Sequence, residues 1–257
     1  MSRPTALIVR APGTNRDGEA AFALDLAGAE TNIVLLNDLL ANPALLNMAQ
    51  MLVIPGGFSF ADALGAGRLF ALELTTRLAD ELAAFVDRGK PVIGICNGFQ
   101  TLIRTGLLPG DGQRIALGHN QTPSGTAAGF ICEWVTLQPV SKHCVWSAGL
   151  TEVIDCPIAH GEGRVAATEA TIKNLRANDQ IALTYSGHNP NGSIADIAGI
   201  TDSTGLVLGL MPHPEDHVLA RQHPQRTRAR TGSHAGGLAG GLGLGLFQAG
   251  VRHARQL

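Results

Sequence analysis

Short apolar runs that alternate with longer amphipathic segments constrain the fold of this chain most. Four such runs lie in its first half, at residues 6–10, 31–36, 51–54 and 91–95. Runs this short and this apolar are typical of strands that are buried on both faces of a parallel sheet. Residues 17–28 and 69–88 carry apolar side chains at the spacing of a helix. The pattern therefore predicts an α/β fold, with strand–helix units repeated along the first half.

The second half of the chain is richer in strands. Five strands are predicted, at residues 130–137, 154–159, 181–185, 194–200 and 206–211. No polar linker separates the halves, and a parallel sheet can extend at its edge by antiparallel strands, so we predict a single domain over residues 1–257. The arginine-rich and glycine-rich residues 221–241 favour a flexible loop, and residues 242–256 resume the spacing of a terminal helix.

The amino-acid composition argues against some classes of binding partner. Charged residues make up 16% of the chain and the net charge is -2, which gives no reason to expect nucleic acid or an anionic membrane. The basic residues within 221–230 could form a nucleotide-binding patch, but a solvated loop is the favoured interpretation. No stretch approaches the ~20 apolar residues of a membrane span, and the N-terminal apolar run is too short for a signal peptide. We therefore expect a cytoplasmic protein.

The cysteines are spaced too widely for a structural metal site. The four of them are Cys96, Cys132, Cys144 and Cys156, and no pair has the C-x-x-C spacing. Thiols stay reduced in the cytoplasm, so we expect neither disulfides nor a bound metal. One cysteine is predicted to be chemically active, and the other three to be structural.

The active cysteine is Cys96, which lies between the predicted strand at residues 91–95 and a helix that follows. Gly94 and Gly98 flank it and form a G-x-C-x-G pattern. A nucleophile at a sharp strand-to-helix turn needs small neighbours, because strand and helix approach closely there. The N–H groups at the start of the helix favour a thiolate, and the N–H of Asn97 can stabilise an oxyanion. A buried, inert cysteine is the alternative, and the two glycines argue against it.

A cysteine nucleophile needs a base and a group that orients the base. His213 directly follows a predicted buried strand and has a proline on each side, and Glu215 lies two residues further on. In extended backbone, residues two apart point to the same side, so Glu215 can bind one imidazole nitrogen and leave the other for Cys96. We predict a Cys–His–Glu triad. The alternative is a surface turn in which the two residues meet by chance.

A second oxyanion donor is expected from another loop at the same end of the sheet. Residues 55–59 follow the strand at residues 51–54 and contain Gly56 and Gly57. We predict that the N–H of Gly57 is this donor. Pro-Gly-Gly alone is ordinary turn chemistry, so the prediction depends on the triad.

Together these segments resemble the class I, triad-type glutamine amidotransferases, and among them the glutaminase subunits of phosphoribosylformylglycinamidine synthase. The resemblance covers nearly the whole chain and rests on Asp17 and residues 12–15, 55–59, 94–100, 130–132, 159–164, 189–193 and 211–215. It implies a flavodoxin-like three-layer fold with helices on both faces of a mostly parallel sheet and with extra antiparallel strands. It also implies that Cys96 attacks the side-chain amide of L-glutamine and forms a glutamyl thioester, and that Gln100 and Gly56 contact the substrate.

The resemblance implies partners as well. Ammonia would pass to a synthetase subunit, PurL, which uses ATP and Mg²⁺ to convert formylglycinamide ribonucleotide to formylglycinamidine ribonucleotide in purine biosynthesis, and a small subunit, PurS, would complete the complex. This chain contains no P-loop, so we expect no cofactor in it. His160, Glu162 and Arg164 form a possible acid–base cluster, but the resemblance gives them supporting roles beside the active site or at the partner surface.

Three features depart from the usual pattern of these subunits. Arg16 replaces a cysteine, Glu133 stands where a basic residue is common, and residues 221–241 lengthen the C-terminal region. None of them touches the predicted triad. Two alternatives remain open: a glutaminase subunit that serves another synthetase, and a catalytically silent regulatory subunit. A DJ-1-like or peptidase-like relative would share the elbow but would not need the segment at residues 211–215.

Overall fold

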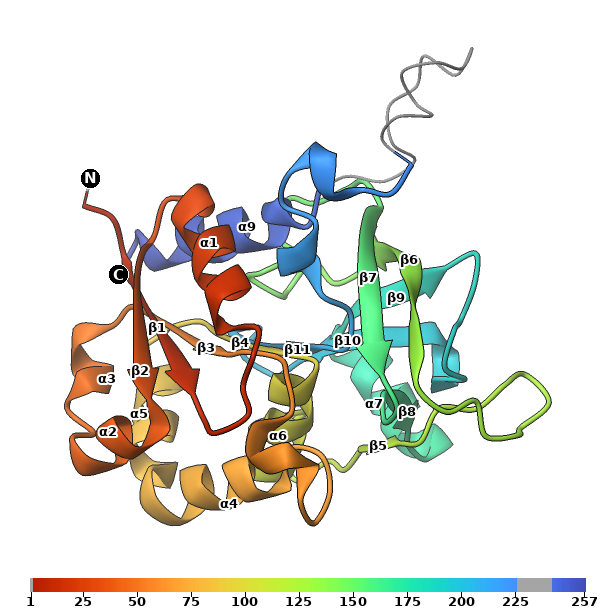
Figure 1. Ribbon diagram of the computed structural model, residues 1–257, viewed down its shortest axis with the longest axis horizontal. Coiled ribbons are helices and arrows are strands. Elements are labelled where there is room, and N and C mark those ends of the chain that lie inside the picture. The colour runs from red at the N-terminus through yellow and green to blue at the C-terminus, as the bar shows by residue number, and fades with distance from the viewer. Residues whose placement is uncertain (1, 226–241) are drawn as a thin grey trace.

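A single large sheet organises the computed structural model, which describes residues 2–225 and 242–257 (Figure 1). Its strand order is β2-β1-β3-β4-β11-β10-β9-β6-β7. The parallel strands are β2 (Glu30–Leu35), β1 (Thr5–Arg10), β3 (Met51–Ile54), β4 (Val92–Ile95) and β11 (Val207–Leu210). The antiparallel strands that extend the sheet are β10 (Ile197–Thr201), β9 (Ile181–Ser186), β6 (Ile131–Pro139) and β7 (Ile154–His160). Within the described residues, the predicted parallel half and the antiparallel extension are both present.

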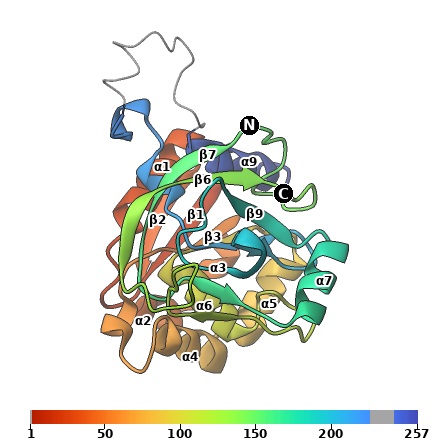
Figure 2. The same ribbon diagram turned by 90° about the vertical axis from the view of Figure 1, so that its right-hand side faces the viewer.

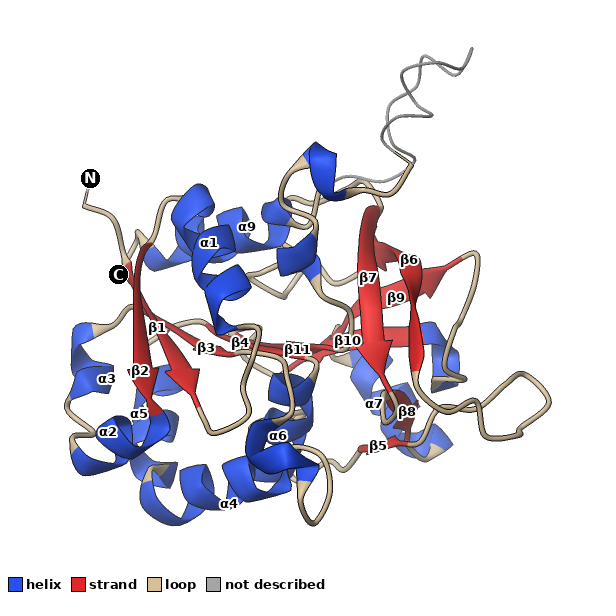
Figure 3. Cartoon of the chain, in the orientation of Figure 1, coloured by secondary structure: helices blue, strands red, loops and turns tan. Residues whose placement is uncertain are grey.

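Helices cover both faces of the parallel strands (Figure 3). One face carries α1 (Asp17–Ala27) and α9 (Leu244–Ala254), which contact each other. The other face carries α2 (Leu36–Ala41), α3 (Leu45–Met48), α4 (Arg68–Arg77), α5 (Ala79–Asp87) and α6 (Asn97–Thr105). This arrangement gives three layers, and it places the buried strands β3 and β4 in the middle one.

The antiparallel end of the sheet has its own small elements (Figure 2). The strands β5 (Ala116–Gly118) and β8 (Arg164–Ala166) form a separate two-stranded ladder, and α7 (Glu169–Ala177) follows β8. Helix α7 is not among the predicted elements, although its N-cap is conventional: the Thr168 hydroxyl accepts a hydrogen bond from the Thr171 N–H.

One predicted helix is in fact two. The sequence predicts a continuous helix over residues 69–88, but α4 and α5 are separated at Leu78, whose backbone has φ −137° and ψ 15°. Leu78 is fully buried, so the break directs this side chain into the core. The predicted terminal helix is confirmed as α9, which packs closely enough against Trp146 that a side chain on Gly250 would overlap the indole.

The predicted loop at residues 221–241 lies mostly outside the described residues, which resume at residue 242. Residues 220–222 form a short 3-10 turn, η4 (Ala220–Gln222). Among the helices that the structure describes, none has the length and apolar character required to cross a membrane.

Candidate active site

Cys96 lies at the turn between β4 and α6, where the sequence places the nucleophile. Its backbone has φ 51° and ψ −106°, which is a strained conformation for a residue with a side chain. The Cys96 N–H donates to the Leu210 carbonyl on β11 at 2.8 Å, so the neighbouring strand holds the turn in place. This is the geometry of a nucleophile elbow, with the thiol presented above the carboxyl ends of the parallel strands.

Two glycines allow this turn to form. A Cβ atom on Gly98 would overlap the carbonyl oxygen of Ile54, and one on Gly94 would lie 2.7 Å from the carbonyl oxygen of Gly98. Helix α6 can therefore approach β3 and β4 so closely only because neither residue has a side chain. The helix then places its first backbone N–H groups beside Cys96.

His213 and Glu215 form a buried pair after β11. The Glu215 Oε1 atom lies 2.7 Å from His213 Nδ1, and the two side chains are 3% and 0% exposed. The His213 N–H donates to the Pro157 carbonyl on β7 at 2.8 Å, which fixes the backbone before the turn. The predicted pairing is present, but its expected cause was wrong. Glu215 lies in the 3-10 turn η3 (Pro214–Asp216), not in extended backbone, and that turn brings the carboxylate back to the imidazole.

His213 and Cys96 meet around Gly56. A Cβ atom on Gly56 would lie 2.8 Å from His213 Cε1 and 3.5 Å from the Cβ of Cys96. The Cys96 thiol donates to the carbonyl of Ala159 at 3.8 Å, and within the described residues the buried Nε2 atom of His213 has no hydrogen-bond partner. A glycine at position 56 thus leaves the space in which the thiol and imidazole can exchange a proton.

The charges around His213 favour its protonated form. Burial acts to lower the pKa of His213, but the Glu215 carboxylate and the negative charge available on Cys96 raise it, and the pKa lies well above its usual value. The Glu215 carboxylate thus stabilises the imidazolium that His213 forms when it takes the proton of a cysteine nucleophile.

The two predicted oxyanion donors lie in loops that are tied together. Asn97 begins α6, so its N–H is one that the helix leaves free. Its side-chain oxygen accepts hydrogen bonds from the N–H of Ser59, at 3.2 Å, and from the Ser59 hydroxyl. Gly57 lies two residues before Ser59, with φ 132°, a value that favours glycine. The Asn97 side chain therefore fixes the position of the Gly57 loop relative to the elbow.

A pocket of about 150 Å³ opens beside the thiol. Its wall is formed by Gly57, Phe58, Asp62, Ala66, Cys96, Gln100, Phe130, Ala159, His160, Gly161 and Glu162. The rings of Phe58 and Phe130 stack with centroids 6.5 Å apart. Cys96 and Gln100, two of the residues predicted to contact substrate or react with it, therefore share one pocket with Gly57. Gly56 lies against the triad and is not part of the pocket wall.

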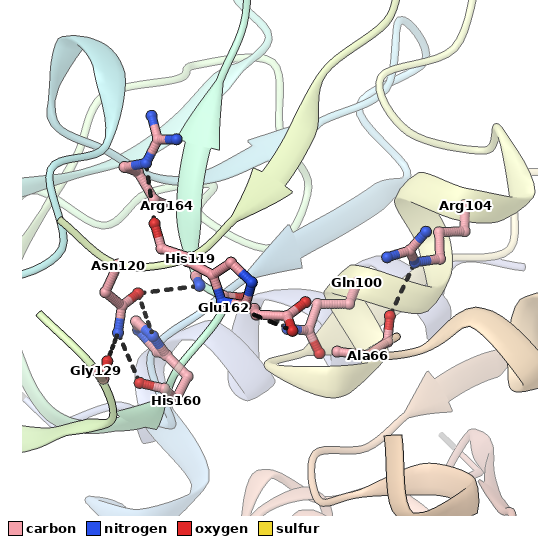
Figure 4. Close-up of polar contacts among 10 residues, drawn as sticks. Ala66, Gln100, Arg104, His119, Asn120, Gly129, His160, Glu162 and Arg164 are labelled. Atoms are coloured by element: carbon pink, nitrogen blue, oxygen red, sulfur yellow. Dashed lines mark hydrogen bonds and ion pairs between the residues drawn. The ribbon is translucent and has the colours of Figure 1, made fainter. Parts of the chain in front are cut away.

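Gln100 connects the elbow helix to the loop after β7 (Figure 4). Its amide nitrogen donates to the Glu162 carbonyl at 2.6 Å, and its amide oxygen accepts from Asn97 Nδ2 at 3.1 Å. Both polar groups of Gln100 thus have protein partners. It lines the pocket as a brace between two walls, and a direct contact with substrate remains a prediction.

The other three cysteines were expected to be structural, and two of them are buried as that expectation requires. Cys144 and Cys156 are buried, and burial raises the pKa of both thiols, so they are inert at neutral pH. Cys132 was expected to be structural but is exposed on β6. Across residues 2–225 and 242–257 no group of three or more histidine, cysteine or acidic side chains is arranged to hold a metal ion.

Comparison with known proteins identifies the family. The model of the CobB/CobQ-like glutamine amidotransferase domain matches residues 3–253. The chain belongs to this family. The expected family and fold are thereby confirmed.

Curated relatives narrow the resemblance within this glutamine amidotransferase family. The phosphoribosylformylglycinamidine synthase subunit PurQ of Treponema denticola is 48% identical over 244 residues, which cover 86% of this chain and 90% of that protein. The PurQ subunit of Dehalococcoides mccartyi is 41% identical and aligns over 100% of both chains. A chain in the structure of PurLQS from Thermotoga maritima has a TM-score of 0.74 and 32% identity, and the match covers 97% of this chain and 98% of that one.

Two departures from the amidotransferase pattern now have a structural place. Arg16 lies 3.3 Å from Asp216 and 3.5 Å from Glu19, so it links the start of α1 to the turn that carries Glu215. Glu133 on β6 lies 3.2 Å from His188 in the loop that follows β9. Neither side chain lies in the pocket wall, but Arg16 packs beside the triad: its Cγ would lie 3.5 Å from a Cβ atom on Gly56, the position around which His213 and Cys96 meet.

Two residues of this amidotransferase site are not indicated by the sequence. Asp62 lines the pocket and accepts a hydrogen bond from Asn97 Nδ2 at 2.9 Å. Asn120 accepts from the Gly163 N–H at 3.1 Å, and it donates to the carbonyls of Gly129, at 3.0 Å, and His160, at 2.7 Å (Figure 4). Both residues act through contacts that are distant in sequence, so no local pattern could have indicated them.

Proposed function

We propose that this chain is the glutaminase subunit of phosphoribosylformylglycinamidine synthase and hydrolyses L-glutamine through Cys96. The observation that carries the proposal is the buried Cys96–His213–Glu215 arrangement beside the small pocket. The PurQ names of relatives that align over most of the chain support the choice of synthetase.

The first half of the reaction releases ammonia. The Cys96 thiolate attacks the side-chain amide carbon of glutamine, and the electron pair of the C=O bond moves to the oxygen. As this tetrahedral intermediate collapses, the C–N bond breaks and His213 gives its Nε2 proton to the departing nitrogen. Ammonia leaves and a glutamyl thioester remains on Cys96.

The second half restores the enzyme. His213, now neutral, takes a proton from a water molecule, and the resulting hydroxide attacks the thioester carbon. The C–S bond then breaks, which returns the thiolate beside a protonated His213 and frees glutamate. Glu215 keeps the imidazole oriented in both halves because its carboxylate accepts a hydrogen bond from the Nδ1–H group throughout.

The backbone N–H groups of Asn97 and Gly57 bind the oxyanion in both tetrahedral intermediates. Gln100 contributes by holding the elbow helix against the Glu162 loop, and we infer that it also contacts the substrate. Gly56 acts by leaving room between the thiol and imidazole. Each of these groups lies in the pocket wall or beside the triad.

Ammonia passes in this proposal to the synthetase subunit PurL, in a complex that also contains PurS. PurL would use ATP and Mg²⁺ to activate the amide oxygen of formylglycinamide ribonucleotide, which ammonia then displaces. The whole complex would act in the cytoplasm. The PurLQS structure of Thermotoga maritima, which contains a chain similar to this one, supports this assignment.

Steady-state glutaminase assays of the full chain, alone and with the PurL and PurS subunits from the same organism, test the proposal. We expect weak ammonia release alone, stronger release in the complex, and loss of both with Cys96→Ala. Glutamine turnover by Cys96→Ala at the rate of the unmodified chain would refute the mechanism. Failure of PurL and PurS to assemble with this chain would refute the choice of synthetase.

A further inference from the structure

The pocket beside Cys96 has two chemically distinct ends. Cys96 and Ala159 lie at the reacting end, where the thiol meets the Ala159 carbonyl. The other end is formed by Ala66, Gln100 and Glu162, which also line a much larger groove of about 1020 Å³. A substrate whose amide carbon lies at Cys96 must therefore direct its opposite end towards this groove.

Acidic groups lie in the pocket wall, and one of them, Glu162, also lines the groove. Asp62 and Glu162 both lie in the pocket wall. Within the described residues, neither carboxylate is paired with a lysine or an arginine. The imidazole of the largely exposed His119 lies beside Glu162, with its Nδ1 3.9 Å from the carboxylate. Carboxylates that are partly removed from water and lack a cationic partner are unfavourable unless a ligand supplies the charge.

The two carboxylates influence each other. Burial raises the pKa of Asp62, the hydrogen bond from Asn97 opposes this, and the nearby charge of Glu162 raises the pKa further. A cation between them would remove this repulsion.

The backbone holds Asp62 in place at a cost. Phe60, Ala61 and Asp62 have φ values of 53°, 55° and 52°, so three successive residues with side chains adopt the left-handed region. Strain of this kind persists where surrounding contacts enforce it, and it is concentrated at functional sites. Here the enforcing contact is Asn97, which binds Asp62 and Ser59 at once.

The pocket wall contains a further hydrogen-bond acceptor, the Nε2 atom of His160, that receives no hydrogen bond within the described residues. His160 is 3% exposed, and its Nδ1 lies 3.1 Å from Asn120 Oδ1. That oxygen already accepts from Gly163, so Nδ1 must carry the ring proton and Nε2 must carry a lone pair. Nε2 is buried without a partner in the described residues. The pocket is thus suited to a ligand that brings N–H donors.

We propose that Asp62 and Glu162 bind the α-ammonium group of glutamine and restrict the pocket to amides that carry this group. The inference rests on the glutaminase activity proposed above. Glutamine supplies N–H donors at both ends, from its side-chain amide near Cys96 and from its ammonium group near the groove. Asp62 and Glu162 are positioning and selectivity residues in this account, and the reacting groups remain those of the triad.

The test compares glutamine with 4-carbamoylbutanoate, which is the same molecule without the α-amino group. The assay uses the full chain in complex with its synthetase subunits and measures kcat/KM for both amides. We expect the unmodified chain to prefer glutamine, and Asp62→Asn and Glu162→Gln each to reduce that preference about tenfold, mainly through the KM for glutamine. Asp62→Asn retains the side-chain oxygen that accepts from Asn97.

Matched controls separate charge from structure. Asp111→Asn changes an exposed aspartate that has a similar φ of 53°, and Glu152→Gln changes an exposed glutamate outside the pocket. Neither should alter the preference. Variants of Asp62 and Glu162 that reduce kcat/KM for both amides equally, or that change neither, would overturn the proposal. Absence of turnover of either amide by the unmodified chain would instead contradict the glutaminase function itself.

Discussion

Two buried histidines lie close to Cys96, and they differ in the group that holds their Nδ1 atom. His213 is bound to the carboxylate of Glu215 at 2.7 Å, whereas His160 is bound to the amide of Asn120 at 3.1 Å. The side chains are almost equally inaccessible to water, at 2% and 3% residue exposure. Their protonation states nevertheless differ, because only one of the two partners carries a charge.

The consequences for the pKa values are opposite. For His213 the Glu215 carboxylate outweighs burial, and the pKa lies well above its usual value. For His160 burial dominates, the positive charge of His213 adds to it, and the pKa falls to about 4. One histidine can therefore exchange protons with substrate, while the other is a fixed hydrogen-bond acceptor. The choice between carboxylate and amide partners determines which imidazole takes part in catalysis.

Replacing the carboxylate partner of His213 by an amide should reduce glutaminase activity more than any other change considered below. We expect Glu215→Gln to reduce kcat by on the order of 10³–10⁴, because the amide neither stabilises the imidazolium nor enforces the Nδ1–H tautomer. Asp216→Asn, in the same 3-10 turn, is the matched control and should retain most activity. Steady-state ammonia release measures both. Near-normal turnover by folded Glu215→Gln would show that His213 does not need its carboxylate.

His160 should make the protein sensitive to acid. Its folded pKa of about 4 lies below the ordinary 6.5, so its stabilising contribution is complete above pH 6.5 and is lost as the pH falls towards 4. This loss amounts to ~3 kcal/mol. Between pH 7 and pH 4 the free energy of unfolding should fall in both proteins. We expect the fall to be ~3 kcal/mol smaller in His160→Gln than in the unmodified chain, because the variant has no imidazole to protonate.

Urea unfolding at the two pH values checks this prediction. His119→Gln is the control, since His119 is largely exposed and its replacement should leave the acid sensitivity unchanged. Equal acid sensitivity of His160→Gln and the unmodified chain would mean that His160 is protonated in the folded state.

Giving His160 a carboxylate partner tests the comparison from the other side. We expect Asn120→Asp to raise the pKa of His160 by about one unit or more, because a negative charge then faces Nδ1. The variant also loses the amide donor to the carbonyls of Gly129 and His160, so it should be destabilised by ~1–3 kcal/mol. NMR titration of the imidazole resonances reports the pKa. A value still near 4 would show that burial alone governs this group.

The smallest effect is expected for Arg16. Its ion pair with Asp216 spans 3.3 Å and is partly exposed to solvent. We expect Arg16→Gln to lower the free energy of unfolding by less than ~1 kcal/mol and the difference to shrink in high salt. Thermal unfolding at low and high salt measures this. A loss of several kcal/mol that is independent of salt would indicate that Arg16 holds the triad turn by packing and not by charge.

The residues that could be predicted from the sequence are those with local signals. Cys96 follows a short apolar run and lies between glycines, and His213 follows another such run and lies between prolines. Both patterns act within a few residues, so they can be read without knowing what packs nearby. The parallel sheet formed by the first strands was predictable from the same short runs, whereas their order in the sheet was not.

The remaining features depend on contacts that are distant in sequence. Asn120 reaches His160 and Gly163 from 40 or more residues away, and Asp62 is fixed by Asn97 on another element. The break between α4 and α5 at Leu78 cannot be predicted from the sequence, because the apolar side chains keep their helical spacing across it. It depends on the packing of Leu78, which is fully buried in the core. Glu215 pairs with His213 as predicted, but through a 3-10 turn and not through the extended backbone that the prediction assumes.

The central claim is that glutamine hydrolysis proceeds through a thioester on Cys96. Mixing the full chain with glutamine, quenching within the first turnover in acid and analysing the peptides by mass spectrometry tests it directly. The account predicts a glutamyl adduct on the peptide that contains Cys96 and none on those that contain Cys132, Cys144 or Cys156. Ammonia release without an adduct on Cys96, together with undiminished release by Cys96→Ala, would contradict it.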